Sequence, residues 1–163
     1  ITVINTYAPT EDKAIEVKEQ FYEDLQKIID EVPRSDTLIV VGDLNAQLGI
    51  EDYFRNVTGK HTLHETTNTN GEMLCQLAVS NTLVVMSTQF QHKTIHKGTW
   101  TSPDQSTLTQ IDHVLINKSK KDLIEDVKTL RGPNIDSDHF LIRAVIKRSM
   151  PLKYKRKSIQ TDK

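Results

Sequence analysis

Apolar residues along the chain follow two spacings, one typical of helices and one typical of strands. A spacing of three or four residues predicts an amphipathic helix whose inner face carries Ala14, Val17, Phe21, Leu25, Ile28 and Val32. Thr10 is placed to cap this helix, and Pro33 ends it. A second, shorter helix is predicted over residues 72–80, with Leu74, Leu77 and Ala78 facing inward.

Short apolar runs between and after these helices predict the strands. They cover residues 1–7, 37–41, 82–86, 98–102, 111–117, 126–130 and 140–146. The run from Leu38 to Val41 is apolar throughout, which is typical of a strand buried on both faces. We expect 98–102 to pair with 111–117, and the polar stretches 46–70 and 89–97 to be connections. The pattern predicts an α/β fold in which two sheets pack as a sandwich flanked by helices.

Polar side chains occur where the predicted strands end. Asp43 and Asn45 follow the buried strand two positions apart, so an extended chain places both on one side. Asp112 lies in another apolar strand, and the pair Asp138-His139 precedes the last one. Strands that end in carboxylates, an amide and an imidazole indicate a scaffold that directs polar groups at a ligand.

Each of these positions also has a purely structural explanation. Asp43 and Asn45 would serve as a polar turn that closes a strand. Asp138 and His139 would serve as a cap, and Asp112 would form a structural salt bridge, since an unpaired carboxylate in an apolar strand is costly.

Composition limits the number of domains, the partners and the compartment of the protein. A chain of 163 residues fits one domain with a substantial core. The net charge of −1 gives no support for a nucleic-acid partner, so any basic surface is local. The single Cys75 excludes an internal disulfide and fits a reducing compartment. No apolar run is long enough to span a membrane.

Five segments together resemble the endonuclease/exonuclease/phosphatase superfamily, which has the DNase I-like fold. They are Asn5-Thr6-Tyr7-Ala8-Pro9, Gly42-Asp43-Leu44-Asn45, Gly98-Thr99-Trp100-Thr101-Ser102, Ile111-Asp112-His113 and Ser137-Asp138-His139. Within the superfamily they are most similar to the apurinic-type endonuclease of non-LTR retrotransposons and to a domesticated protein related to it. The resemblance covers residues 1–147, and residues 148–163 read as a basic tail or linker.

The resemblance implies metal-dependent hydrolysis of a phosphodiester bond in double-stranded DNA, with Mg²⁺ or alternatively Mn²⁺. Asp138 would be the metal ligand, and His139 would contact the phosphate as general base or as a charged stabiliser. Asp112 would orient the imidazole, and Asp43 would transfer a proton. Asn45 and Tyr7 would contact the phosphate, although Tyr7 also suits the wall of a core.

Three further residues are candidates for substrate binding by the same resemblance. They are Asn5, Asn70 and Thr99. Asn5 would otherwise only hold the Pro9 turn, Asn70 would only start a helix, and Thr99 would lie in the core. Thr10 stands where the family often has Asn.

The family normally carries a segment before the Tyr-x-Pro motif, with a Glu that is a principal metal ligand. The chain starts at Ile1 inside a strand pattern, so we expect it to lack this N-terminal portion. Exposed strand edges would then favour self-association.

Three functions remain open. The first is a DNA endonuclease that nicks its substrate, either active or, for lack of that Glu, inactive as this fragment. The second is a non-catalytic domesticated interaction module on the same scaffold. The third, ranked last, is a phosphoesterase acting on an inositol phosphate or lipid head group. We expect no membrane partner and no small-molecule cofactor, and a nuclear rather than cytoplasmic location.

Overall fold

The computed structural model describes residues 1–132 and 136–147, and in this part of the chain two α-helices alternate with strands. The elements are β1 (Thr2–Tyr7), α1 (Ile15–Asp30), β2 (Leu38–Asp43), α2 (Thr69–Ser80), β3 (Leu83–Val85), β4 (Trp100–Thr101), β5 (Leu108–Thr109), β6 (Asp112–Asn117), β7 (Ile124–Leu130) and β8 (Leu141–Ile146). Short 3₁₀ turns lie in the connections at Asp52–Phe54, Met86–Thr88, Thr94–His96 and Lys118–Leu123. The basic tail predicted over 148–163 lies outside the described residues, so its boundary stays a prediction.

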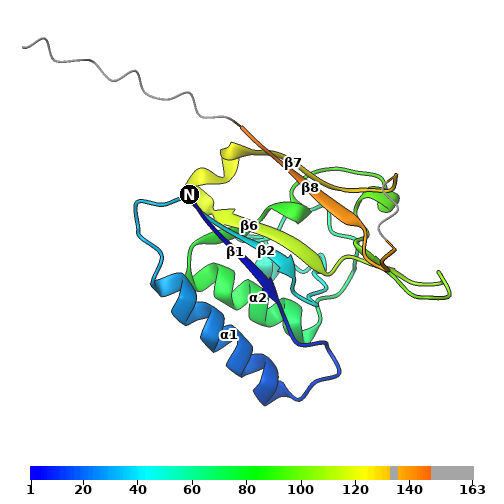
Figure 1. Ribbon diagram of the computed structural model, residues 1–163, viewed down its shortest axis with the longest axis horizontal. Helices are drawn as coiled ribbons and strands as arrows, with labels where there is room; N and C mark the ends of the chain where they lie inside the picture. The colour runs from blue at the N-terminus through cyan, green and yellow to red at the C-terminus, as the bar shows by residue number, and fades with distance from the viewer. Residues whose placement is uncertain (133–135, 148–163) are drawn as a thin grey trace, which may run out of the picture.

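The larger sheet has the strand order β1-β2-β6-β3, and β1, β2 and β6 lie side by side in Figure 1. β1 runs parallel to β2, and α1 provides the crossover that parallel strands need. β6 runs antiparallel to both of its neighbours, β2 and β3. β7 and β8 form a separate antiparallel pair, and β4 and β5 form a short hairpin.

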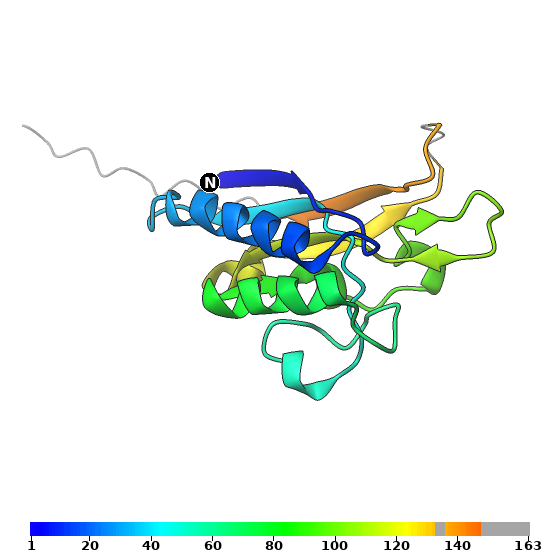
Figure 2. The ribbon, with the colours of Figure 1, turned by 90° about the horizontal axis from the view of Figure 1, so that it is seen from below.

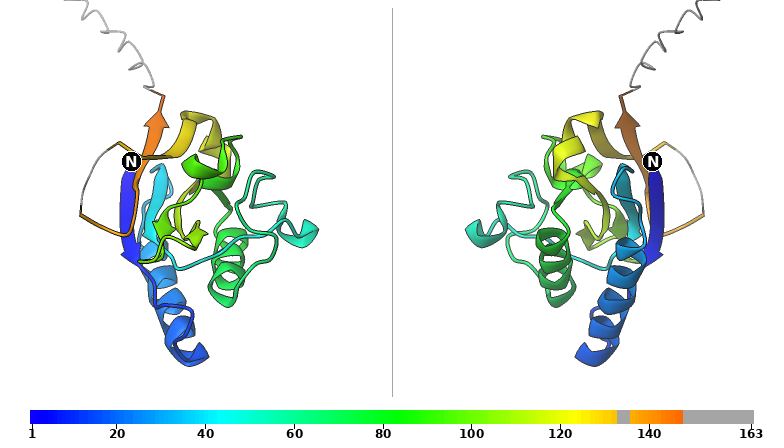
Figure 3. Two further views of the ribbon diagram at one scale, coloured as in Figure 1. Left: turned by 90° about the vertical axis from the view of Figure 1, so that its right-hand side faces the viewer. Right: turned by 90° about the vertical axis from the view of Figure 1, so that its left-hand side faces the viewer.

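Both α-helices cover the same face of the larger sheet (Figure 2), where Leu25 of α1 and Leu74 of α2 share a buried cluster with Val40 of β2. β7 and β8 pack on the opposite face, where Val127 shares a second cluster with Val114 of β6. In the end views of Figure 3 the helices lie below and β7 and β8 above. Two packed sheets flanked by helices confirm the predicted α/β sandwich. Among the residues placed in the structure, no helix is both long and apolar enough to cross a membrane.

The buried side of α1 agrees only in part with the apolar spacing, since Leu25 is buried and Phe21 packs against the same cluster as predicted. Val17 and Ile28 are 50% and 51% exposed, and the buried residues are Lys18, Tyr22, Leu25 and Ile29. Lys18 tolerates burial because its ammonium donates to the carbonyl of Glu11 at 2.7 Å and lies 3.1 Å from the Glu11 carboxylate. The helix starts after Ala14 without a side-chain cap, so the prediction that Thr10 caps it was wrong.

The predicted pairing of 98–102 with 111–117 was also wrong. Trp100 of β4 lies opposite Thr109 of β5, whereas β6 lies between β2 and β3. The apolar centre of β6 is buried on both faces, so it belongs in the middle of the larger sheet. The short segment Leu108–Thr109 pairs with β4 in the hairpin instead.

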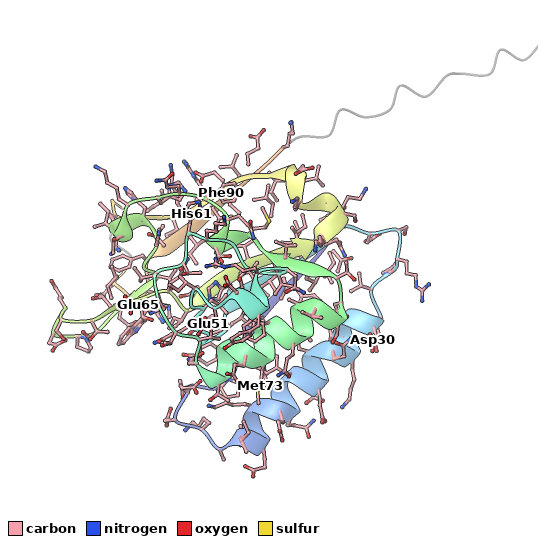
Figure 4. The ribbon with its side chains drawn as sticks, turned by 180° about the vertical axis from the view of Figure 1, so that it is seen from behind. Asp30, Glu51, His61, Glu65, Met73 and Phe90 are labelled. Carbon is pink, nitrogen blue, oxygen red and sulfur yellow. The ribbon has the colours of Figure 1, made fainter. Side chains whose placement is uncertain are left out.

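The long polar connection after β2 is fastened to the start of α2, and Figure 4 shows Glu51 on this connection. The Glu51 carboxylate accepts hydrogen bonds from the backbone N–H and the hydroxyl of Thr67, at 2.7 and 2.8 Å. Asn68 caps α2, because its side-chain oxygen accepts from Gly71 N–H at 2.8 Å, and its amide donates to the Asn45 carbonyl at 3.0 Å. These bonds hold α2 beside the residues that follow β2.

The register of the larger sheet aligns three polar residues at one end. Tyr7 of β1 lies opposite Asp43 of β2, and Asp43 lies opposite Asp112 of β6. Paired residues on neighbouring strands point to the same face, so the three side chains form one row. This row faces the side of the sheet on which β7 and β8 pack, because Val41 and Val114 lie two residues away and belong to that cluster.

Gly42 permits the close approach of β1 and β2 beside this row. Its φ of +137° lies in a region that other residues rarely adopt, and an added Cβ would lie 1.9 Å from the carbonyl oxygen of Thr6. A side chain at this position would therefore push β1 away from β2.

We predict that Gly42→Ala lowers the free energy of unfolding by about 2 kcal/mol or more, because backbone strain and a backbone clash act together. Gly132→Ala is the matched control, since nothing lies within 4 Å of a Cβ there, and it should change stability by less than about 0.5 kcal/mol. Urea unfolding followed by circular dichroism measures both. Equal effects of the two substitutions would contradict the strand contact.

Candidate active site

A cleft of about 420 Å³ opens at the sheet end where β1 and β2 finish. Its lining includes five of the predicted site residues, which are Tyr7, Asn45, Asp43, Asp138 and His139. Asp112 joins them through a hydrogen bond between its carboxylate and His139 Nδ1, at 3.1 Å. The predicted convergence of these residues is thus seen in the geometry.

The imidazole of His139 lies between two carboxylates. Nδ1 faces Asp112 Oδ2 at 3.1 Å, and Nε2 lies 3.8 Å from Asp43 Oδ2. The side chains of Asp43 and Asp112 are only 13% and 15% exposed, whereas that of His139 is 31% exposed. A carboxylate that accepts from Nδ1–H fixes the tautomer and the ring orientation, which leaves Nε2 facing the cleft.

Burial raises the pKa of Asp43 above its ordinary value. The neighbouring carboxylates of Asp112 and Asp138 act in the same direction, because a second negative charge nearby is unfavourable. The backbone N–H of Asn45 and the imidazole of His139 oppose the shift. Asp43 therefore holds a proton more readily than a surface carboxyl group does.

Asn45 is held in place by both of the strands that border it. Its backbone N–H donates to Asp43 Oδ1 at 2.9 Å, and its side-chain amide donates to the carbonyl of Ala8 at 2.9 Å. Its φ of +48° is a left-handed conformation that Asn adopts more readily than most residues. The chain can therefore turn away sharply after β2 while the amide stays at the edge of the cleft.

His113 secures the same turn from below. Its Nε2 lies 2.7 Å from the carbonyl of Ala46, and its Nδ1 lies 2.7 Å from the Ser87 hydroxyl. The neutral ring donates to the carbonyl and accepts from the hydroxyl, so both nitrogens have partners although the side chain is buried. Burial lowers the pKa of His113 to about 4.

Asp138 and Tyr7 lie on the outer side of the cleft. The carboxylate of Asp138 is exposed and accepts a hydrogen bond from Trp100 Nε1 at 2.7 Å. Tyr7 is 69% exposed, which excludes the alternative that it forms the wall of a core. Its position allows a contact with a ligand in the cleft, and that contact stays a prediction.

The three predicted substrate-binding residues do not line the cleft. Asn5 is exposed on β1, two residues before Tyr7. Asn70 is fully buried, and its amide donates to the carbonyl of Pro9 at 3.0 Å. Thr99 is 2% exposed, and its hydroxyl accepts from the N–H groups of Ile111 and Asp112 at 3.0 and 3.2 Å. Asn70 and Thr99 therefore shape the backbone around the cleft, and any contact of Asn5 with substrate stays a prediction.

Sequence reasoning missed Glu11, Gln47 and Asn68, which also line the cleft. The Glu11 carboxylate accepts from the N–H groups of Thr69 and Asn70, both at 3.1 Å, at the start of α2. A negative charge there complements the helix dipole. No local signal reveals this contact, because the partners lie 58 and 59 positions apart in the sequence.

The residues present suit a divalent cation. One ligand atom from each of Asp43, Asp112 and His139 lies within 4.8 Å of the others. Within residues 1–132 and 136–147, this is the group of acidic and histidine side chains that could hold a metal ion. Carboxylate oxygens suit both Mg²⁺ and Mn²⁺. Asp138, the predicted ligand, lies outside this cluster with one oxygen on Trp100, so its role toward a metal stays a prediction.

The fold and this cleft define an α/β sandwich of the endonuclease/exonuclease/phosphatase type. The sequence profile of the family described as endonuclease-reverse transcriptase matches residues 1–143, and the chain belongs to that family. Hydrolysis of phosphodiester bonds by the nuclease route, with a divalent metal, is the chemistry that this superfamily supports.

Two curated relatives are similar to most of the chain. Craniofacial development protein 2 of Bos taurus is 35% identical over 144 residues, which cover 88% of this chain and 24% of that protein. Craniofacial development protein 2 of Tragulus javanicus is 34% identical over 144 residues, covering 88% and 25%. The chain thus spans about a quarter of the length of these relatives.

Solved structures show the same fold at lower identity. A 3′-5′ exonuclease, NExo, from Neisseria meningitidis has a TM-score of 0.63 at 21% identity, covering 90% of this chain and 61% of that one. The endonuclease domain of TRAS1, a telomere-specific non-LTR retrotransposon, has a TM-score of 0.58 at 16% identity, covering 89% and 57%. These likenesses confirm the predicted DNase I-like architecture.

The geometry of His113 predicts a loss of stability in mild acid. The unfolded imidazole has an ordinary pKa near 6.5 and the folded one a pKa of about 4, so the unfolded chain binds the proton first. Stability is complete above pH 6.5 and falls as the pH drops toward 4. We expect a loss of about 1–2 kcal/mol between pH 6.5 and pH 5.

Urea unfolding at several pH values, with Trp100 fluorescence as the signal, measures this slope. His113→Asn should be less stable at pH 7.5 and should show a flatter dependence on pH. The pKa of His64 is also lowered by burial, so the difference between the parent and the variant isolates His113. Identical slopes would contradict the assignment.

Proposed function

We propose that this chain forms the catalytic core of a DNA endonuclease that hydrolyses a phosphodiester bond with the help of Mg²⁺. The observation that carries the proposal is the arrangement Asp112–His139–Asp43, in which one imidazole faces two largely buried carboxylates at the edge of a cleft. Such pairing of titratable groups with unlike environments is typical of acid–base sites.

His139 and Asp112 would act together on the attacking side. Asp112 holds Nδ1–H, so Nε2 is free to accept a proton from water or, once charged, to stabilise the phosphate. Asp43, whose pKa burial raises, would protonate the leaving oxygen. The amide of Asn45 and the hydroxyl of Tyr7 would orient the phosphate from the two sides of the cleft.

A divalent cation held by carboxylates of this cleft would supply charge stabilisation at the phosphate. Asp138, at the outer side of the same cleft, would hold this ion, which leaves Asp43 to transfer the proton and Asp112 to hold His139. Mg²⁺ is the cation that an oxygen-rich set favours, with Mn²⁺ as the alternative.

Double-stranded DNA is the proposed substrate. One Neisseria structure of this fold is described as a 3′ phosphatase bound to a product DNA hairpin, with a TM-score of 0.60 at 22% identity. The retrotransposon endonuclease domain also supports a DNA substrate for the fold. Nicking of chromosomal DNA would place the protein in the nucleus.

The second candidate is a folded interaction module that retains the scaffold without turnover. Both curated relatives carry names that refer to craniofacial development and not to a nuclease. On this proposal the geometry of the cleft is retained because it is part of the folded scaffold. The protein would bind a partner instead of cutting DNA. Nicking that depends on His139 distinguishes the two.

We predict that the chain converts supercoiled plasmid to the nicked form in Mg²⁺ or Mn²⁺, and that EDTA stops the reaction. His139→Ala and Asp43→Ala should each lower the rate about 10²–10⁴-fold, because each removes a group that transfers a proton. Gel densitometry of the nicked form measures the rates.

Asp24→Asn is the control, since Asp24 pairs with Lys27 on the exposed side of α1, and it should leave the rate unchanged. Circular dichroism must show that every variant is folded. If His139→Ala nicks as fast as the folded parent, the interaction module becomes the better proposal.

A further inference from the structure

Trp100 is connected to the catalytic segment in two ways. Its indole Nε1–H donates to Asp138 Oδ2 at 2.7 Å, and its backbone forms an antiparallel bridge with His139. The adjoining residues extend the contact, because Thr101 N–H donates to the Asp138 carbonyl at 3.0 Å and Phe140 N–H donates to the Thr99 carbonyl at 2.7 Å. The segment that carries Asp138 and His139 is therefore bound along β4.

The hydrogen bond from the Trp100 indole orients the Asp138 carboxylate, which the backbone hydrogen bonds do not do. The backbone contacts fix where the segment lies, but an exposed carboxylate on that segment remains free to rotate. A hydrogen bond from an N–H to an ionised carboxylate is short and directional, and it selects one orientation. The indole thereby commits one oxygen of Asp138 and determines where the other one points.

We propose that Trp100 is a positioning residue that sets the orientation of the Asp138 carboxylate for a divalent cation in the cleft. The proposal rests on the metal-dependent function proposed above, and it adds a residue that acts through Asp138 and not on the substrate. Partners that orient metal ligands typically contribute about 10–100-fold to metal affinity. Phe at this position would fill similar space but could not donate.

The hydrogen bond itself can be tested without any catalysis. Trp100 is the one tryptophan of the chain, so the ¹⁵N-labelled protein gives one indole N–H resonance. Asp138→Asn and Asp138→Ala should each shift this resonance, because each removes the charged acceptor. Asp104→Asn is the matched control on the same hairpin, where Asp104 bonds Ser102 and Ser106, and it should leave the resonance in place.

Cation binding is tested on the same signal. Mn²⁺ added to the parent should broaden the indole resonance at low stoichiometry, and titration calorimetry should show that Trp100→Phe binds Mn²⁺ about tenfold more weakly. An indole resonance that neither Asp138 variant moves, or equal Mn²⁺ affinity in Trp100→Phe and the parent, would overturn the proposal.

Nicking kinetics then separate positioning from general damage. Trp100→Phe should raise the half-saturating Mg²⁺ concentration about tenfold and restore most of the parent's rate at saturating Mg²⁺. A lower rate at saturation with an unchanged half-saturating concentration would overturn the proposal. If the parent itself fails to nick, the predicted nicking by this chain fails, while the resonance and calorimetry still decide the role of Trp100.

Discussion

The register that aligns Tyr7, Asp43 and Asp112 across β1, β2 and β6 is the constraint on which the rest of the site depends. A slip of one residue in either pairing would turn these side chains to the opposite face of the sheet. Apolar clusters on both faces oppose such a slip, because Val40 and Val114 would each leave the cluster in which they are packed. The cores that stabilise the sandwich thus also place the carboxylates, and a strained Gly42 is tolerated because it lets β1 and β2 approach closely.

Buried polar groups extend this order from the strands into the loops. Thr99 binds the backbone at the start of β6, and His113 binds the backbone just after Asn45. Inside a protein, polar groups that all have partners act as rigid connectors, whereas unpaired ones are costly. This explains why Thr99 is important to the cleft although it lies beneath it, and why mild acid, which would charge His113, should loosen the same region.

The residues proposed for catalysis come from both sheets of the sandwich. Asp43 and Asp112 belong to the larger sheet, while His139 lies just before β8 of the smaller one. Their contact therefore depends on how one sheet packs on the other. The second apolar cluster forms this packing. The family relation agrees with this arrangement, since the matched part of the chain contains the larger sheet, β7, the first half of β8 and the whole cleft. Chemistry in such a site is sensitive to any change that moves the two sheets apart.

The sequence by itself determined the elements and the family. Apolar runs and the strand-end motifs around Asp43, Asp112 and His139 predicted the sandwich and the residues that meet in the cleft, because both signals are local. Only the tertiary structure decided which residues face the cleft. Thr99 and Asn70 are buried, and Lys18 is buried in place of Val17 since Glu11 neutralises it. These outcomes depend on contacts between residues distant in sequence, and local periodicity carries no information about such contacts.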